Sequence, residues 1–441
     1  MAVSNEILGL LLIGCMLFAI FVGFPISFTL IFLGIVFGYI GFGDTVFWLM
    51  TLQFNSTMLE QTLTAVPLFV FMGVMMEEAG LMERLFESVR LMLARLRGSL
   101  YLAVLFVAII FGAATGIVGA SVTILGIMAA KTMSRAKYDV RLSAGTITAG
   151  GTLGILIPPS IMLVVMGPVL EVPVTDLFAA AIIPGIMMAV LYAGYALLRC
   201  YFNPSLGPAA PDEYLNADKK HIWREFFGGL VPPAGLIFAA LGSILFGFAT
   251  PTEGAGCGAA GGLFLALAYR RLTFAKLKSA LIKTLEISVL ILFLVAASNF
   301  FGAVFSNLGT PGMLTDILLT LDLPPILILA MIMLFIFLLG WPLEWVPIVL
   351  IIVPILLPLV EQLGFNLVWF GILVAVNLQT AWLSPPVALS AYFLKGVAPQ
   401  WDLKDIYYGM MQFMVIQLIG LGLIVAFPQI ALWLPEWIYG K

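Results

Sequence analysis

The sequence predicts an all-α polytopic membrane protein with two inverted-topology repeats, each containing about five spans and one re-entrant hairpin. The 441 residues are 62% hydrophobic and only 10% charged, with a mean hydropathy of +1.14, whereas a soluble domain carries about 25% charged residues. The apolar runs are continuous, which favours helices over the alternating pattern of an outer-membrane β-barrel. The two halves of the chain also match each other on either side of a polar midpoint.

Charge and cysteine content exclude several function classes. The net charge of −3 and the lack of a basic surface argue against nucleic acid as a partner. The three cysteines have no CxxC spacing and the single histidine lies in a polar segment, so we expect no zinc site, haem or disulfide framework. No nucleophile elbow or phosphate-binding glycine loop is visible, so we do not expect an enzyme. The N-terminus lacks the basic region of a cleavable signal, and its apolar run predicts a retained first span.

An internal duplication relates the two halves. Residues 150–160 (GGTLGILIPPS) align without a gap with residues 377–387 (NLQTAWLSPPV), at an offset of 227. Three further landmarks keep an offset between 226 and 228: GFPIS with ATPTE, Phe111-Gly112 with Leu339-Gly340, and Pro173 and Asp176 with Pro399 and Asp402. Four landmarks in one register indicate a repeat rather than coincidence.

The duplication defines the expected domain organisation. We expect a first repeat at 1–202, a cytoplasmic linker at 203–225, a second repeat at 226–428 and a C-terminal tail at 429–441. In the first repeat, spans are predicted near residues 6–22, 26–42, 60–78, 142–170 and 177–199. Residues 99–130 are too short for two spans and a turn, so they predict a hairpin, whose partner is 324–360. Broken helices are predicted at 142–170 and 367–394.

Basic residues determine the orientation of the repeats. Lys and Arg cluster at residues 84–97 and 131–141, but the equivalent loops at 310–325 and 358–368 contain neither. Conversely, the basic stretch 270–283 matches residues 44–57, which have no base. Because cytoplasmic loops are enriched in Lys and Arg, equivalent loops face opposite sides, as in an inverted repeat. This predicts a cytoplasmic linker and external termini. The amphipathic segment 81–97 is expected to lie along the cytoplasmic interface.

Helix-breaking residues concentrate at two matching places, within 142–170 and 367–394. Non-helical backbone at membrane depth is tolerated only where protein or a water-lined cavity satisfies it. Interrupted helices in corresponding positions of inverted halves indicate a transport site, because freed carbonyls can bind a hard cation and half-helix N-termini favour an anion. Two structural alternatives remain: the breakers only kink packed helices, and the small residues of the hairpin tips only allow close packing.

The candidate ligands come from the breaks and the hairpin tips. The candidates for ion binding are Thr115, Gly116, Ser121, Gly150, Thr152, Gly340, Glu344, Asn377 and Thr380. The candidates for substrate binding are Thr148, Gly151, Pro158, Ser160, Gln379, Ser384 and Pro385. Na⁺ is the only metal expected, held by backbone carbonyls and hydroxyls, and no other cofactor is expected. Glu344 could bind a cation, accept a proton or cap backbone N–H groups, and Glu253 is predicted to cap a helix N-terminus.

Several motifs together resemble a known family. VPLFVFMGVMMEEAGL (66–81), FGAATGIVGAS (111–121), the stretch 138–161, ATPTEGAG (249–256) and NLQTAWLSPPVAL (377–389) are similar to the large membrane subunit of tripartite ATP-independent periplasmic (TRAP) transporters, the DctM type. The resemblance covers essentially the whole chain. It implies a sodium-driven elevator mechanism in a bacterial or archaeal inner membrane. It also implies a small DctQ-type membrane subunit, an extracytoplasmic solute-binding protein and a small organic anion such as a C4-dicarboxylate, sialic acid or 2-oxo acid.

The sequence departs from the common family pattern at two places, and two other readings stay open. Many members have Ser-Gly-Ser where this chain has Thr115-Gly116-Ile117, and a frequent Thr-Pro is replaced by Ser384-Pro385. A proton-coupled or stand-alone organic-anion carrier or antiporter would also have inverted repeats. An intramembrane enzyme would need a His, Asp or Cys constellation near one interface, and the sequence has none.

Overall fold

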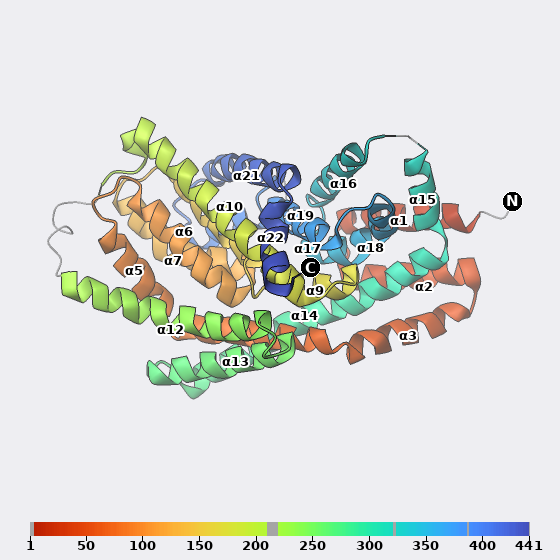
Figure 1. The fold of residues 1–441 in the computed structure, drawn as a ribbon, viewed down its shortest axis with the longest axis horizontal. Helices are drawn as coiled ribbons and strands as arrows, with labels where there is room; N and C mark the ends of the chain where they lie inside the picture. Colours follow the sequence, from red (N-terminus) through yellow and green to blue (C-terminus); the bar gives the residue numbers. More distant parts are fainter. Residues whose placement is uncertain (1–3, 210–218, 321–322, 386–387, 441) are drawn as a thin grey trace.

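Helices form all the regular secondary structure of residues 4–209, 219–320, 323–385 and 388–440, the part of the chain that the computed structural model describes (Figure 1). This confirms the all-α class. Within that part, six helices are long and apolar enough to cross a membrane, or seven if one bent pair forms a single span. The shorter apolar helices of the described residues are Ile26–Phe42, the hairpin arms Ser99–Gly112 and Pro325–Leu339, and the broken-helix segments Ile161–Leu170 and Leu367–Trp382.

The first repeat begins with five α-helices and a short 3-10 helix, followed by two hairpin arms and a broken helix. Its first elements are α1 (Asn5–Val22), α2 (Ile26–Phe42), α3 (Thr45–Leu59), η1 (Gln61–Thr64), α4 (Ala65–Glu78) and α5 (Leu81–Met92). The hairpin arms are α6 (Ser99–Thr115) and α7 (Val118–Arg135). The broken helix comprises α8 (Val140–Thr152), η2 (Leu153–Ile155) and α9 (Ile161–Leu170), and α10 (Val174–Phe202) and η3 (Pro204–Leu206) follow.

The second repeat has the same order of elements. It runs through α12 (Lys219–Leu245), α13 (Pro251–Ala268), α14 (Phe274–Asn307) and α15 (Thr310–Leu319). Its hairpin is α16 (Pro325–Leu339) followed by α17 (Trp345–Pro347), the π-helical η4 (Ile348–Ile352) and α18 (Val353–Gln362). Its broken helix is α19 (Leu367–Gln379), η5 (Thr380–Trp382) and α20 (Leu389–Val397), followed by α21 (Leu403–Ala426) and α22 (Gln429–Tyr439).

The sequence register reappears in the helix boundaries. α8 and α19 each contain 13 residues and start and end 227 residues apart. Their N-caps are also equivalent: Asp139 Oδ1 accepts from the Leu142 N–H at 2.8 Å, and Asn366 Oδ1 accepts from the Trp369 N–H at 3.1 Å. A carboxylate or amide oxygen at this position satisfies a backbone donor that has no partner within the helix. The same capping chemistry therefore starts both broken helices.

Helix α3 lies where the sequence analysis expected a loop before the span 60–78. Polar residues lower the hydropathy of this segment, but Thr51 and Thr57 donate to the carbonyl oxygens four residues earlier, so their hydroxyls are satisfied inside the helix. Residues 45–78 then match the length of the 34-residue α14. The first repeat bends by 54° at this place, whereas α14 is continuous. The bend is at Glu60, whose backbone is extended and whose side chain accepts from the Thr62 N–H.

Two expected boundaries differ in the structure. The predicted linker 203–225 overlaps α12, which begins at Lys219, because Ile222 is buried and Glu225 forms an ion pair with Arg84 of α5. Residues 429–439 of the predicted tail form α22, which packs on α10. The Tyr439 hydroxyl donates to the Leu245 carbonyl oxygen at 3.2 Å, which ties α22 to the end of α12.

The apolar side of α5 contacts protein. Leu81, Leu85, Phe86 and Val89 are buried, and α5 packs against α12 and α6. The helix is amphipathic, as the sequence predicts, but α12 and α6 cover its apolar face, which the sequence analysis had expected to lie along the membrane interface.

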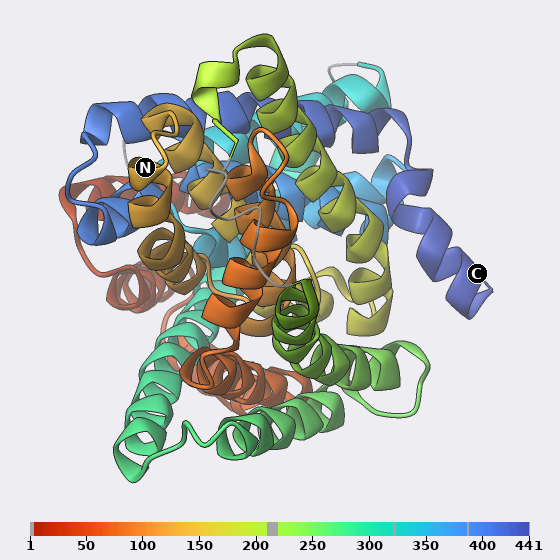
Figure 2. The same cartoon turned by 90° about the vertical axis from the view of Figure 1, so that its left-hand side faces the viewer.

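The helices form two layers. We define the scaffold layer as α2–α4 and α12–α14, which pack on one another, with α13 on α4 and α14 on α2, α3 and α4. We define the hairpin layer as both hairpins, both broken helices, α10 and α21. Figure 1 shows α12, α13, α14 and α3 along one side of the molecule, and Figure 2 shows the same separation from the end. The candidate site residues thus lie in one layer.

Candidate functional site

The first break lies between α8 and α9, and all of its polar side chains are satisfied locally. The Thr148 hydroxyl donates to the Ala144 carbonyl oxygen at 2.8 Å, and the Thr152 hydroxyl donates to that of Ala149 at 2.8 Å. The Ser160 hydroxyl donates to the Ile155 carbonyl oxygen at 2.6 Å. Residues 151–160, Pro158 included, are buried. Oxygen ligands at this break would therefore come from the backbone and from hydroxyl lone pairs.

The second break lies between α19 and α20 and holds an unsatisfied amide oxygen. Asn377 Nδ2 donates to the Met333 carbonyl oxygen of α16 at 2.7 Å, but its buried Oδ1 accepts no hydrogen bond from the described residues. The Thr380 hydroxyl donates to the Asn377 carbonyl oxygen at 2.6 Å, and that of Ser384 to the Thr380 carbonyl oxygen at 2.5 Å. Pro385 is half-buried, and Pro386 lies outside the described residues.

The two breaks meet through a chain of amides. Gln379 Nε2 donates to the Thr152 carbonyl oxygen at 3.0 Å, and Gln379 Oε1 accepts from Gln417 Nε2 at 2.7 Å. Gln379 and Gln417 are fully buried, and Gln417 Oε1 is a second buried oxygen with no donor among the described residues. Gln417 is not among the site residues predicted from the sequence. The available signal was an amide within the otherwise apolar run of α21.

Each hairpin tip packs against the break of its own repeat. A Cβ on Gly112 of α6 would lie 2.8 Å from the Gly154 Cα, which shows that the two backbones are in contact. A Cβ on Gly340 would lie 3.0 Å from the Ala381 Cβ in the other repeat. These four residues are equivalent pairs in the duplication, so the same tip-to-break contact occurs twice.

Glycines of the first break and tip serve close packing. A Cβ on Gly151 would overlap the Val122 side chain of α7, and one on Gly150 would lie 3.2 Å from the Ala108 Cβ. Gly116 ends α6 with a φ of 61°, a conformation that glycine adopts without strain. Ser121 is buried in α7, and the side chain of Thr115 lies outside the described part of the structure.

Two glutamates predicted from the sequence have different surroundings. Glu344 occupies the N-cap position of α17, but its side chain is exposed and makes no capping hydrogen bond. Glu253 forms a capping box with Thr250: its carboxylate accepts from the Thr250 N–H at 2.8 Å, and Thr250 Oγ1 accepts from the Glu253 N–H at 3.3 Å. The capping role predicted for Glu253 is confirmed. Among the described residues, Glu344 forms no hydrogen bond or ion pair with either break.

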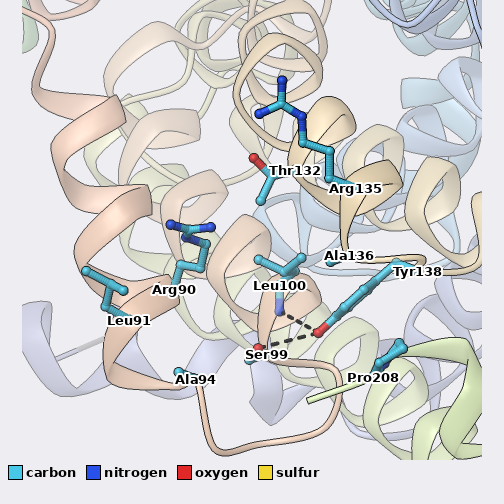
Figure 3. A pocket seen from close by; sticks show the side chains of 10 residues that line it. All are labelled: Arg90, Leu91, Ala94, Ser99, Leu100, Thr132, Arg135, Ala136, Tyr138 and Pro208. Atoms are coloured by element: carbon cyan, nitrogen blue, oxygen red, sulfur yellow. Dashed lines mark hydrogen bonds between the residues drawn. The ribbon is translucent and has the colours of Figure 1, made fainter. Parts of the chain in front are cut away.

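A small basic pocket lies at the end of the first hairpin. The cavity, about 190 Å³, is lined by Arg90 of α5, Arg135 at the end of α7, Ser99 and Tyr138 (Figure 3). The Tyr138 hydroxyl is 3.4 Å from the Ser99 hydroxyl and accepts from the Leu100 N–H at 3.5 Å. Burial raises the pKa of Tyr138, so its hydroxyl stays neutral at physiological pH.

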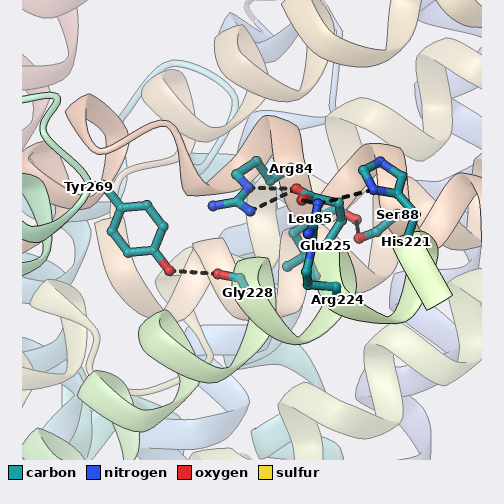
Figure 4. Close-up of polar contacts among 8 residues, drawn as sticks. All are labelled: Arg84, Leu85, Ser88, His221, Arg224, Glu225, Gly228 and Tyr269. Carbon is teal, nitrogen blue, oxygen red and sulfur yellow. Dashed lines mark hydrogen bonds and ion pairs between the residues drawn. The ribbon is translucent and has the colours of Figure 1, made fainter.

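Polar contacts join α5 to the second repeat. Arg84 Nε donates to Glu225 Oε2 at 2.8 Å, and the Arg84 guanidinium lies 5.6 Å from the centre of the Tyr269 ring (Figure 4). The Tyr269 hydroxyl donates to the Gly228 carbonyl oxygen at 2.8 Å. These contacts fix α5 to α12 and α13 of the scaffold layer.

Two repeats with hairpins and broken helices that meet at the centre define a polytopic inverted-repeat membrane carrier. The chain belongs to the DctM component of the tripartite ATP-independent periplasmic transporters, whose family model matches residues 13–430. It is thus a TRAP large membrane subunit, a multi-pass membrane protein of a family whose systems are tripartite.

Relatives and a solved structure agree with this assignment. The chain is 30% identical to the sialic acid TRAP transporter large permease protein SiaM of Vibrio cholerae, over 96% of this chain and 97% of that protein. It is 28% identical to the C4-dicarboxylate TRAP transporter large permease protein DctM of Pseudomonas aeruginosa, over 88% and 90% of the two chains. The crystal structure of the YdaH transporter of Alcanivorax borkumensis shares the fold, with a TM-score of 0.62, 16% identity, and coverage of 89% of this chain and 90% of that one.

Proposed function

We propose that the chain is the large subunit of a sodium-coupled TRAP transporter that imports a small organic anion across the inner membrane by an elevator movement. The observation that carries the proposal is the contact between the two breaks through Gln379 and Thr152. Both breaks and both tips belong to the hairpin layer, so the site would move as one body past the scaffold layer. Carriers of this architecture bind their cargo near the midplane, at the repeat interface.

The buried oxygens support a sodium site. Asn377 Oδ1 and Gln417 Oε1 are buried and accept no hydrogen bond from the described residues. A buried polar atom without a partner is costly, and amide and carbonyl oxygens are the ligands that hard cations prefer. Asn377 of the second break and Gln417 of α21 therefore fit a cation such as Na⁺, with the carbonyl oxygens of the break as further ligands.

The organic anion and the partners follow from the family. SiaM and DctM are named for sialic acid and C4-dicarboxylates, and both kinds of compound carry carboxylates. The N-termini of α9 and α20 lie directly after the breaks and would favour an anion there. We expect a small DctQ-type membrane subunit to be required, and an extracytoplasmic solute-binding protein to deliver the anion.

Reconstitution into proteoliposomes tests the proposal. The chain, its small subunit and a candidate binding protein are assayed for uptake of a C4-dicarboxylate, sialic acid or a 2-oxo acid under an inward sodium gradient. Uptake should require both the binding protein and sodium, and Asn377→Ala should raise the sodium concentration needed for half-maximal uptake. Glu344→Gln, at an exposed position, is the control and should transport normally. Uptake that follows a proton gradient without sodium and is lost in Glu344→Gln would instead establish a proton-coupled carrier.

A further inference from the structure

A cleft separates the scaffold layer from the first hairpin. One cavity of about 360 Å³ lies between α4 and α14 on one side and α7 and α20 on the other, and it reaches Ile117 and Gly119 at the hairpin tip. A second cavity of about 460 Å³ runs along α7 past Ile127 to Arg271. Both cavities are lined by Glu77 and Ile124, so they adjoin each other at these two residues. The cleft leads from the tip to the basic stretch 270–283, on the side predicted to be cytoplasmic.

An ion pair lies inside this cleft. Lys283 Nζ of α14 is 3.8 Å from Glu77 Oε1 of α4, and these two are the charged residues lining the cavity next to the tip. Lys283 is 45% exposed and Glu77 28% exposed. By contrast, Lys276 is held more tightly, with Nζ 3.1 Å from Glu78 Oε2 and 3.4 Å from the Glu78 carbonyl oxygen. Lys283 is therefore a cation beside the hairpin tip whose ion pair with Glu77 is longer than that of Lys276 with Glu78.

The pair has no counterpart in the other repeat. The duplication offset of 226–228 and the length match of α14 with residues 45–78 place the equivalents of Lys283 within residues 54–57 and those of Glu77 within residues 303–306, and neither stretch contains a charged residue. Equivalent positions of inverted repeats face opposite sides of the membrane. The lysine and its carboxylate partner thus belong to one side of the transport pathway alone.

We propose that Lys283 receives the carboxylate of the transported organic anion when the cleft is open to the cytoplasm. The anion displaces Glu77 from Lys283 as it leaves the hairpin tip. When the anion departs, Glu77 pairs with Lys283 again and competes with rebinding from the cytoplasm. This role rests on the proposed function, because it requires an organic anion as cargo. It makes Lys283 a substrate-contacting residue of the scaffold layer, distinct from the breaks.

Inhibition of uptake by internal anion tests this role. Proteoliposomes holding the complete transporter are preloaded with rising concentrations of the transported anion, and the concentration that halves uptake is measured. Lys283→Gln should raise this concentration by about tenfold, as expected for the loss of one charge pairing. Lys283→Arg should restore the wild-type value. Glu77→Gln should lower it, because Lys283 then has no competing carboxylate.

A matched control and the wild type separate the possible outcomes. Lys278→Gln removes a lysine from an exposed position of the same helix that lines neither cavity, and it should leave the half-inhibitory concentration unchanged. If Lys283→Gln and Glu77→Gln both match Lys278→Gln while the wild type transports the anion, the role of Lys283 is disproved. If the wild type transports no organic anion with any binding protein, the proposed function itself fails. Glu77→Gln alone tests the role if Lys283→Gln does not fold.

Discussion

Gln379 and Thr152 occupy the same position in the two repeats, and Gln379 Nε2 donates a hydrogen bond to the Thr152 carbonyl oxygen at 3.0 Å. Their separation of 227 residues equals the offset of the duplication. Equivalent residues of a two-fold arrangement touch each other only next to the axis that relates them. The pseudo-two-fold axis therefore passes between the two breaks. The hydrogen bond has no symmetric counterpart, because the side chain of Thr152 has no amide group that could donate to the Gln379 carbonyl oxygen.

Removing this amide should destabilise the centre of the hairpin layer. Gln379→Leu leaves the Thr152 carbonyl oxygen and Gln417 Nε2 buried without their partners, at a cost of about 1–3 kcal/mol. We expect a lower melting temperature in detergent and loss of uptake. Asn307→Ala is the control, since it removes a similar amide-to-carbonyl bond at an exposed position and should have little effect. Equal melting temperatures for the two variants would contradict the prediction.

The sequence predicted the features that depend on strong local signals. Proline and glycine residues indicated where both breaks lie, and Gly116 indicated the first hairpin tip. The distribution of the few Lys and Arg residues indicated that the repeats are inverted. It did not predict α3, whose threonines satisfy their hydroxyls within the helix, nor α22, whose position depends on contact with α10. The contact of Gln379 with Thr152 and Gln417 was also beyond it. Such contacts depend on the packing of distant segments, which hydropathy does not describe.

A methyl group on Gly112 should prevent the first tip from seating on its break. In Gly112→Ala the new Cβ would meet backbone atoms of Gly154, which cannot rotate away as a side chain can. Overpacking of this kind costs about 1–3 kcal/mol. Gly14→Ala is the matched control, because Gly14 lies within α1 and its Cβ would have no neighbour within 4 Å. We expect Gly112→Ala to lose uptake and thermal stability while Gly14→Ala keeps both. Normal uptake by Gly112→Ala would show that the tip can move off the break without loss.

The two equivalent N-caps should contribute similar stability. Asp139→Ala and Asn366→Ala each remove the side-chain acceptor for a backbone N–H at the start of a broken helix. Loss of an N-cap costs about 0.5–2 kcal/mol. Asp402→Ala provides the control, because Asp402 is the N-cap residue of α21 but makes no capping hydrogen bond. Thermal unfolding of the three variants should show two comparable losses and a smaller one. A loss for Asp402→Ala as large as the others would refute the capping explanation.

The ion pair between Arg84 and Glu225 should couple α5 of the first repeat to α12 of the second. Arg84→Glu places two carboxylates together, whereas the exchanged pair Arg84→Glu with Glu225→Arg restores opposite charges. Because both side chains are partly exposed, we expect a coupling of only about 0.2–1 kcal/mol, and less at high salt. The exchange also gives up the contact of Arg84 with the Tyr269 ring, so the double variant should recover stability only in part. A double-mutant cycle of melting temperatures at low and high salt measures the coupling.

The pair Arg90 and Glu87, which lies entirely within α5, is the control and should show no effect on the attachment of α5 to α12. A coupling of zero at both salt concentrations would mean that buried residues such as Leu85 alone hold the two helices together.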